Sequence, residues 1–420
     1  MKRYGMVLSG VVILLALSGM VPSTAQDSLN VTMVGIYETP GLTRDVVVSG
    51  DYAYFAGGFP NLRVVNIQNP FNPVEVGSYD TTGGAYGVAL SGSYAYIANG
   101  EAGLWIVDVS DPADPVEVGH YDTPDIANGI AVSGSYAYVA DAFSGLRVIN
   151  VQNPFHPVET GFYNTPGEAN GVTVSGNYAY VGDGYGGLRV INVENPSHPT
   201  EVGFCDTSGY AWGVAVSGNY AYVADRISGL RVVNIQNPSA PIVVGSYEAP
   251  GGPYSVTVQA NHAYVANDHG GLRVVNIQNP SHPVEVGYYD TPGQARGVVA
   301  SGIYAYVADY DYFEIFDCSA ALPVPNSKQV DVPRSYSLLP AYPNPFNSAT
   351  RISYSVLVSG RVQLVVYDLL GRQVGMITDR TVTPGNYSVT WDAGDLASGI
   401  YFCRMEAGRF QQTQKMVLLK

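Results

Sequence analysis

A six-residue motif recurs seven times at a constant spacing of 42 residues, and this period limits the possible folds more than any other feature of the chain. The first copy reads Ser-Gly-Asp-Tyr-Ala-Tyr, and the copies begin at Ser49, Ser91, Ser133, Ser175, Ser217, Gln259 and Ser301. A long, strict repeat period is the sequence signature of propellers and solenoids. We therefore predict an all-β array of seven similar units.

The sequence of each unit predicts four short strands. In the third unit the apolar or aromatic runs lie at 129–132, 136–140, 146–151 and 158–163, here called strands a, b, c and d. A Ser-Gly turn separates strands a and b, and a turn with two prolines separates strands c and d. Four strands per unit correspond to one blade of a propeller, so we predict a seven-bladed β-propeller.

The two ends of the array predict how the ring closes. Residues 34–41 match the strand d text of 286–293 but precede the first strand a. The last unit contains strands a, b and c and then runs into proline-rich sequence without a strand d. We expect the N-terminal strand to complete the seventh blade, which removes an open sheet edge. An open β-solenoid is the alternative, although its repeats are usually shorter and need no borrowed strand.

The repeat text resembles a known family. Gly-Ile-Ala-Val-Ser-Gly, Tyr-Ala-Tyr-Val-Ala-Asp, Gly-Leu-Arg-Val-Ile-Asn-Val and Asn-Pro-x-x-Pro, all within 129–157, are similar to the LVIVD-repeat family of bacterial propellers. The resemblance covers about residues 30 to 318. It implies a propeller located outside the cytoplasm, in a family whose ligands are mostly unknown. The resemblance assigns no catalytic residue to this chain. Unit seven departs from the pattern, because one residue is missing before Phe313 and Asp317-Cys318-Ser319 replaces the usual Asn-Val/Ile-x.

The N-terminus has the pattern of a secretory signal peptide. Lys2 and Arg3 precede an apolar run at 6–17, and small residues predict cleavage after Ala25. We therefore assign 1–25 to the signal peptide, 26–318 to the propeller and 319–337 to a linker rich in Pro, Ser and Ala. A membrane anchor is the alternative for the N-terminus, but the apolar run is short for a spanning helix. We expect no transmembrane segment after cleavage.

Residues 338–420 have the alternating pattern of a small Ig-like β-sandwich. Four segments, at 342–347, 366–372, 398–402 and 415–420, resemble the C-terminal sorting domain of type IX secretion substrates. The resemblance implies a type IX-like secretion machinery as partner and export to the surface or exterior of a Gram-negative-type bacterium. It also implies that the domain is often removed after export. An ordinary Ig-like accessory module is the alternative.

Charge and cysteine content exclude several classes of partner. The chain has a formal net charge of −15, and residues 26–337 hold ten basic and thirty acidic side chains. A surface this acidic repels the phosphate backbone of nucleic acids. We therefore expect no binding to nucleic acid. The three cysteines lie in different units or domains, and we expect buried thiols, with a Cys205–Cys318 disulfide as the minority alternative.

One position of the repeat has a different residue type in most units, although the residues around it are nearly constant. It lies in the d–a loop, at the entrance to strand a and next to the channel, on the face where propellers usually bind ligands. Its occupants are Arg44, Tyr86, Asn128, Asn170, Trp212, Tyr254 and Arg296. These side chains either simply cap the channel or form a recognition ring.

The basic residues favour a ligand site on the same face. Five arginines repeat at one position of strand c and are most simply structural. Apart from the two linker cations, the remaining three are Arg44, Arg226 and Arg296, all in b–c or d–a loops. We therefore predict an anion site for an acidic glycan or an acidic peptide, with Tyr254 and Trp212 for stacking and Asn128 and Asn170 for hydrogen bonds.

A second ring, at the end of strand b, is acidic or amide: Asn99, Asp141, Asp183, Asp225, Asn267 and Asp309. We expect these side chains to bond the backbone of their own turns, with a cation site in the channel as the alternative. The sequence contains no metal-ligand spacing, no nucleophile motif and no cofactor motif. We expect a monomeric, non-enzymatic binding protein, and the alternative is a secreted carbohydrate-active or other hydrolytic propeller enzyme.

Overall fold

The computed structural model describes residues 28–57, 61–322, 335–394 and 396–420. The predicted signal peptide, 1–25, lies outside the described residues, as does 323–334 of the predicted linker. The chain divides into two compact units after Pro323.

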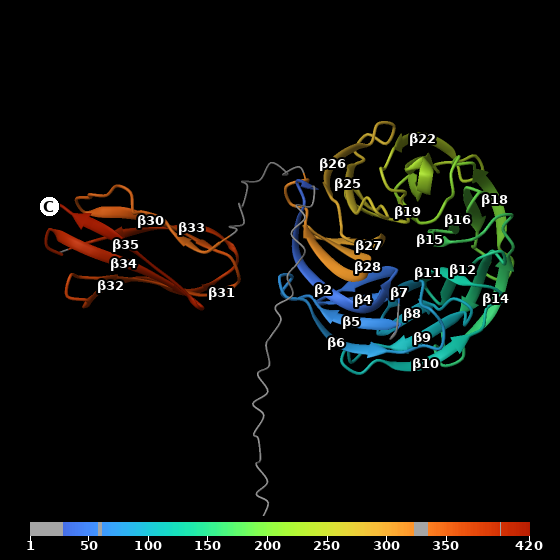
Figure 1. Cartoon of the computed structure of the whole chain (residues 1–420), viewed down its shortest axis with the longest axis horizontal. Coiled ribbons are helices and arrows are strands. Elements are labelled where there is room, and N and C mark those ends of the chain that lie inside the picture. The colour runs from blue at the N-terminus through green and yellow to red at the C-terminus, as the bar shows by residue number, and fades with distance from the viewer. Residues whose placement is uncertain (1–27, 58–60, 323–334, 395) are drawn as a thin grey trace, which may run out of the picture. The chain divides into compact units, whose positions relative to one another are not determined.

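The first unit is a ring of seven antiparallel sheets, each a blade (Figure 1). Blade 1 consists of β3 (Asp45–Ser49), β4 (Tyr52–Ala56), β5 (Leu62–Asn66) and β6 (Val74–Tyr79). Blade 2 consists of β7 (Gly87–Ser91), β8 (Tyr94–Ala98), β9 (Leu104–Asp108) and β10 (Val116–Tyr121). Blade 3 consists of β11 (Ala127–Ser133), β12 (Tyr136–Asp141), β13 (Leu146–Asn150) and β14 (Val158–Tyr163).

The next three blades repeat this order. Blade 4 consists of β15 (Gly171–Ser175), β16 (Tyr178–Gly182), β17 (Leu188–Asn192) and β18 (Thr200–Cys205). Blade 5 consists of β19 (Val214–Ser217), β20 (Tyr220–Ala224), the 3-10 turn η1 (Arg226–Ser228), β21 (Leu230–Asn234) and β22 (Ile242–Tyr247). Blade 6 consists of β23 (Ser255–Gln259), β24 (His262–Ala266), β25 (Leu272–Asn276) and β26 (Val284–Tyr289).

The seventh blade joins the two ends of the propeller sequence. It contains β27 (Ala295–Ser301), β28 (Tyr304–Asp317) and the N-terminal β2 (Thr32–Thr43). The first part of β28 pairs with β27 and the later part with β2. The Cys318 N–H donates to the Ile303 carbonyl at 2.9 Å, as the Ile67 N–H does to Asp51 at 2.8 Å between strands b and c of blade 1. One element therefore supplies both strands b and c, and the predicted closure by an N-terminal strand d is confirmed (Figure 1).

A short strand precedes the closing strand and was not predicted. β1 (Ser28–Leu29) pairs with β26 and adds a fifth strand to blade 6. Asn30 then adopts a positive φ of 56°, which an Asn tolerates better than most residues, and the chain continues into β2 on blade 7.

The propeller core lies between the blades. Seven clusters of buried apolar side chains each combine residues of two successive blades. Strand b of blade 1, with the sequence Tyr-Ala-Tyr-Phe-Ala, is buried at four of its five positions because neighbouring blades cover both of its faces. At the closure, Phe55 of blade 1 stacks on Phe313 of blade 7 with ring centroids 5.4 Å apart. The junction between blades 7 and 1, like the other junctions, is therefore closed by packing of buried apolar side chains.

The second unit is a small β-sandwich. One sheet contains β29 (Ser337–Leu338), β30 (Ala349–Val356) and β33 (Gly385–Asp392), and the other contains β31 (Gly360–Tyr367), β32 (Gln373–Val382), β34 (Gly399–Ala407) and β35 (Phe410–Leu418). Their inner faces enclose a separate apolar core that includes Tyr354, Trp391 and Met405. This agrees with the sandwich predicted from the sequence, except that the sequence pattern did not identify β29 or β32.

Candidate functional site

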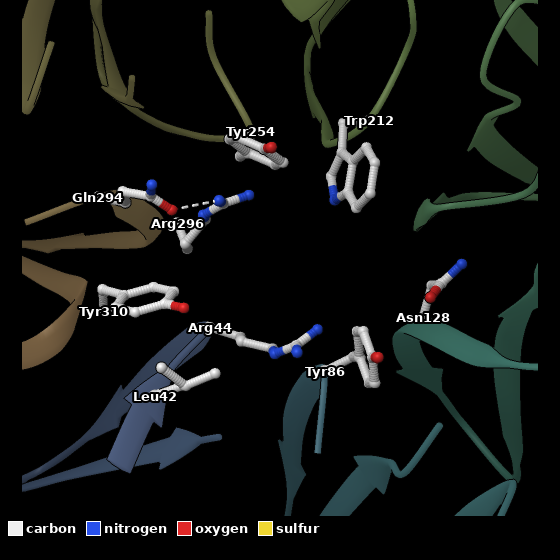
Figure 2. Close-up of a pocket in the computed structure, with 9 residues that line it drawn as sticks. All are labelled: Leu42, Arg44, Tyr86, Asn128, Trp212, Tyr254, Gln294, Arg296 and Tyr310. Atoms are coloured by element: carbon white, nitrogen blue, oxygen red, sulfur yellow. Dashed lines mark hydrogen bonds between the residues drawn. The ribbon is translucent and has the colours of Figure 1, made fainter. Parts of the chain in front are cut away.

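A cavity of about 250 Å³ lies where the d–a loops converge, and six of the eight predicted ligand-binding residues line it (Figure 2). They are Arg44, Tyr86, Asn128, Trp212, Tyr254 and Arg296. Figure 2 shows these side chains extending from different blades toward one central space. The repeat position that varies in sequence thus gathers its side chains at one place, while their role in binding stays a prediction.

The remaining two predicted residues lie outside the cavity lining. Asn170 is buried, with 2% of its surface exposed, and its side-chain amide donates to the Glu168 carbonyl at 2.9 Å. Its amide oxygen faces the amide of Asn128 at 3.4 Å. Arg226 belongs to η1 in a b–c loop and donates to the hydroxyl of Tyr254. Neither residue lines the cavity, but each contacts a residue that does.

Guanidinium groups lie over aromatic rings in the cavity wall and directly beside it. The Arg44 guanidinium lies 3.8 Å from the ring centroid of Tyr86, and that of Arg296 lies 3.8 Å from the ring centroid of Tyr254. Arg226 approaches Tyr254 to 4.2 Å. Stacking on a ring face holds a guanidinium in place while its N–H donors remain at its edge. The arrangement is suited to an anionic group that accepts several hydrogen bonds.

Only one of these three arginines has a carboxylate neighbour among the described residues. Arg296 lies 3.7 Å from Asp268 and also donates to the side chain of Gln294. Arg44 and Arg226 have no ion pair within the part of the chain that the structure describes. By contrast, each strand c arginine is paired within its own blade: Arg63 with Glu75, Arg147 with Asp141 and Glu159, Arg189 with Asp183 and Glu201, Arg231 with Asp225, and Arg273 with Glu285 and Asp290. This agrees with the structural role expected for the strand c arginines.

Backbone contacts between blades fix the entrance of each strand a. A bridge joins the b–c loop of one blade to the residue before the variable position of the next, as between Ala142 and Ala169. The residue after the variable position is Gly in five of the seven blades, and a Cβ on Gly171 would lie 2.5 Å from the Trp212 carbonyl oxygen. The scaffold therefore holds each variable side chain at a fixed point around the channel.

One junction replaces this backbone bridge with a side-chain contact. The residue that would bridge to Arg226 is Pro253, which has no N–H to donate. The Arg226 side chain instead crosses to the Tyr254 hydroxyl of blade 6. The contact between blades 5 and 6 thus joins Arg226 to Tyr254, a residue of the cavity wall.

The acidic ring does not line the cavity. Asp141, Asp183, Asp225 and Asp309 are fully buried, and each holds the d–a loop that enters its own blade. Thr207 donates to Asp225 at 2.6 Å, and the Gly293 N–H donates to Asp309 at 2.8 Å. The expected bonding to the residue's own b–c turn is therefore wrong in detail, because the main partner is the preceding d–a loop. Burial raises the pKa of Asp225 and of Asp309 to about 6 in spite of these hydrogen bonds.

The three cysteines are free thiols. Cys318 and Cys403 are buried as expected, and burial raises the pKa of each to about 12. Cys205 is only partly buried, so the prediction of burial is wrong for this residue. The alternative Cys205–Cys318 disulfide is absent from the described residues.

Three cavity residues were missed by the sequence reasoning: Leu42, Gln294 and Tyr310. Leu42 belongs to the closing strand β2, and Tyr310 lies in the b–c turn of the irregular seventh unit. Both lie where the repeat is interrupted, so comparison with other units could not identify them. Gln294 lies two residues before Arg296 in the d–a loop, and its only signal was that it neighbours a variable position.

The fold and the site define a closed seven-bladed propeller with a small cavity at one mouth of its channel. Solved structures share this fold at low identity. U3-55K aligns with a TM-score of 0.57 and 10% identity over 68% of this chain and 98% of its own. The RRP9 WD40 repeats align with a TM-score of 0.58 and 9% identity over 70% and 99%. The computationally designed Ika8 protein aligns with a TM-score of 0.50 and 9% identity over 84% and 98%. These likenesses concern the fold alone.

The chain belongs to the LVIVD-repeat family. The family model, described as LVIVD repeat, matches seven consecutive segments: 40–81, 82–123, 125–165, 166–207, 208–249, 250–291 and 292–321. A comparison with curated proteins gives no match.

Residues 340–419 match the model of the secretion system C-terminal sorting domain. A domain of this kind implies interaction with the type IX secretion machinery and export to the cell surface or exterior of a Gram-negative bacterium. In the described part of the chain, no helical segment reaches the length and hydrophobicity that a bilayer crossing needs.

Proposed function

We propose that this protein is a secreted, non-enzymatic propeller whose cavity face binds the anionic group of a ligand. The observation that carries the proposal is the charge on Arg44 and Arg226, which have no ion pair among the described residues. The propeller is otherwise strongly acidic, so three cations at one mouth form a local exception. Such a site attracts a carboxylate or sulfate while the rest of the surface repels other anions.

The acidic ring favours binding over catalysis. A hydrolase with paired carboxylates needs two carboxyl groups that face a substrate across a gap. Here the buried aspartates accept hydrogen bonds from loop residues such as Thr207 and Gly293, and none of them lines the cavity. Their raised pKa values follow from burial at structural positions and require no catalytic role.

An array of acidic glycans and acidic peptides tests the proposal. Wild-type protein should bind a subset of the anionic probes, and Arg44→Ala with Arg296→Ala should weaken that binding by about tenfold or more. Arg361→Ala with Arg372→Ala in the sorting domain removes the same charge from exposed positions and serves as the matched control. Unchanged binding in the cavity variant would refute an anion site at this mouth.

A further inference from the structure

The b–c loops of blades 3, 4 and 5 carry large apolar side chains on the face that holds the cavity. Phe143, Tyr185 and Ile227 are 71%, 85% and 90% exposed, and we call these three residues the apolar rim. They occupy one position of the repeat, where blades 2, 6 and 7 have the polar residues Glu101, His269 and Asp311 and where the sequence of blade 1 has Phe59, which lies outside the described residues. Within the described residues, the apolar side chains at this position thus lie in three consecutive blades.

Tyr185 connects the apolar rim to the cavity through contacting aromatic rings. The ring of Tyr185 meets that of Tyr210 edge-on, with centroids 4.9 Å apart. Tyr210 lies 5.7 Å from Trp212, which lies 5.0 Å from Tyr254 in the cavity wall. A chain of contacting aromatic rings therefore connects the exposed rim to the arginines.

The geometry of these rings is unfavourable for a stacked sugar chain. The interplanar angles along the path are 89°, 35° and 71°, so the rings do not form a flat platform. The faces of Tyr86 and Tyr254 already have guanidinium groups 3.8 Å from their centroids. A sugar ring would have to displace an arginine to stack on a face that already carries a guanidinium.

The size of the cavity points in the same direction. Its volume of about 250 Å³ is below the range of pockets that enclose a whole small ligand. It suits the end of one acidic side chain, while the remainder of the ligand lies outside on the face. Exposed Phe, Tyr and Ile beside Trp and Arg match the composition of the central part of a protein interface.

We propose that the partner is a polypeptide. One carboxylate, from an Asp or Glu side chain or a C-terminus, enters the cavity between Arg44 and Arg296, and neighbouring apolar side chains pack on the apolar rim. This inference rests on the proposed anion site and adds the class of ligand. Burial of the apolar rim supplies the non-electrostatic attraction that an acidic peptide needs to approach a propeller of net negative charge.

The test uses the full chain and two sets of defined probes. The first set is an array of synthetic 12-residue peptides with one Asp or Glu among Leu, Ile and Phe, each with a matched Asn or Gln version. The second is the acidic-glycan array. The rim variant combines Phe143→Ser, Tyr185→Ser and Ile227→Ser. A control combines Val116→Ser, Val158→Ser and Ile242→Ser, which are 52%, 59% and 61% exposed on outer strands.

We expect acidic peptides to bind, their amide versions to bind at least about tenfold more weakly, and the rim variant to lose about tenfold or more in affinity. The control should bind as wild type does, and equal melting temperatures for all variants verify that the fold is intact. Peptide binding that the rim variant leaves unchanged overturns the inference. Glycan binding that depends on Arg44 but not on the apolar rim also overturns it while sustaining the anion site. Absence of binding to both arrays overturns the anion site and this inference together.

Discussion

Glu314 is the most unusual single residue of the propeller. It occupies the strand c position that holds an arginine in blades 1, 3, 4, 5 and 6, as its pairing with Ile36 of β2 shows. It is fully buried, and neither side-chain oxygen has a hydrogen-bond partner among the described residues. Burial, together with the nearby Asp309 carboxyl, raises the pKa of Glu314 well above its usual range. The residue is therefore expected to stay protonated in the folded protein.

We predict that Glu314→Gln stabilises the propeller at pH 8 but not at pH 4. In the unfolded chain the carboxyl ionises at its ordinary pKa, whereas in the fold it resists ionisation, so wild-type stability falls as pH rises above that ordinary value. The neutral amide removes this loss and should raise the free energy of unfolding at pH 8 by about 2 kcal/mol. Urea denaturation at both pH values measures the difference. The exposed Glu101→Gln should change neither value, and an equal gain for Glu314→Gln at both pH values would contradict the explanation.

Comparison of units identified single residues well only at positions that all seven units share. Tyr86, Asn128 and Trp212 were found because five intact units fixed the position that they occupy. Leu42, Tyr310 and Glu314 lie in the closing strand or in the irregular seventh unit, where alignment to the repeat fails. Their importance comes from a tertiary contact between the chain's two propeller ends, which no local pattern encodes.

At the scale of elements, the b–c loop has one backbone feature that recurs around the ring. Its first residue has a left-handed conformation, with φ of 58° at Gly100, 54° at Gly184, 42° at both Ala142 and Arg226, and 59° at Tyr310. A residue with a Cβ pays about 1–2 kcal/mol for this conformation, whereas glycine adopts it freely. Arg226 and Tyr310 both accept the strain next to the cavity, which is consistent with a functional reason for their side chains.

Replacing these residues by glycine should separate stability from binding. We predict that Ala142→Gly raises the free energy of unfolding by about 0.5–1 kcal/mol and leaves peptide binding unchanged. Arg226→Gly relieves the same strain but removes the guanidinium that contacts Tyr254, so it should weaken binding of an acidic peptide by about tenfold. Urea denaturation and peptide titration of both variants provide the measurements. If Arg226→Gly bound like Ala142→Gly, Arg226 would have no part in the site.

Elements were predicted where burial imposes a strong pattern and missed where it does not. The b and c strands are covered on both faces, and their near-continuous apolar text was unambiguous. β1 has only two residues, both exposed, and lies outside the repeat. β32 has a single buried residue, Val382, and contains Gly, Asp and Arg, so it lacks the alternation that reveals a strand.

For the whole molecule, the repeat period determines the ring and the early strand d copy determines its closure. The repeat period does not predict which side chains differ from one blade to the next. Charge and aromatic side chains concentrate in blades 5, 6, 7, 1 and 2 around the cavity, and the apolar rim covers blades 3 to 5. These features overlap at blade 5, where Trp212, Arg226 and Ile227 come from one unit. The proposed ligand specificity therefore rests on the few positions at which the copies of the scaffold differ.

The propeller and the sorting domain have separate hydrophobic cores, which predicts that export and ligand binding can be separated. A chain without 338–420 should fold its propeller and bind acidic peptides as before, but it should remain in the periplasm of its host. The full chain should reach the cell surface or medium because residues 340–419 carry the sorting signal. Fractionation of the host with intact-mass measurement of each form checks both statements and reveals whether the sorting domain is removed. Surface recovery of the truncated chain, or recovery of the full chain through Lys420 in the periplasm alone, would refute the assignment of export to this domain.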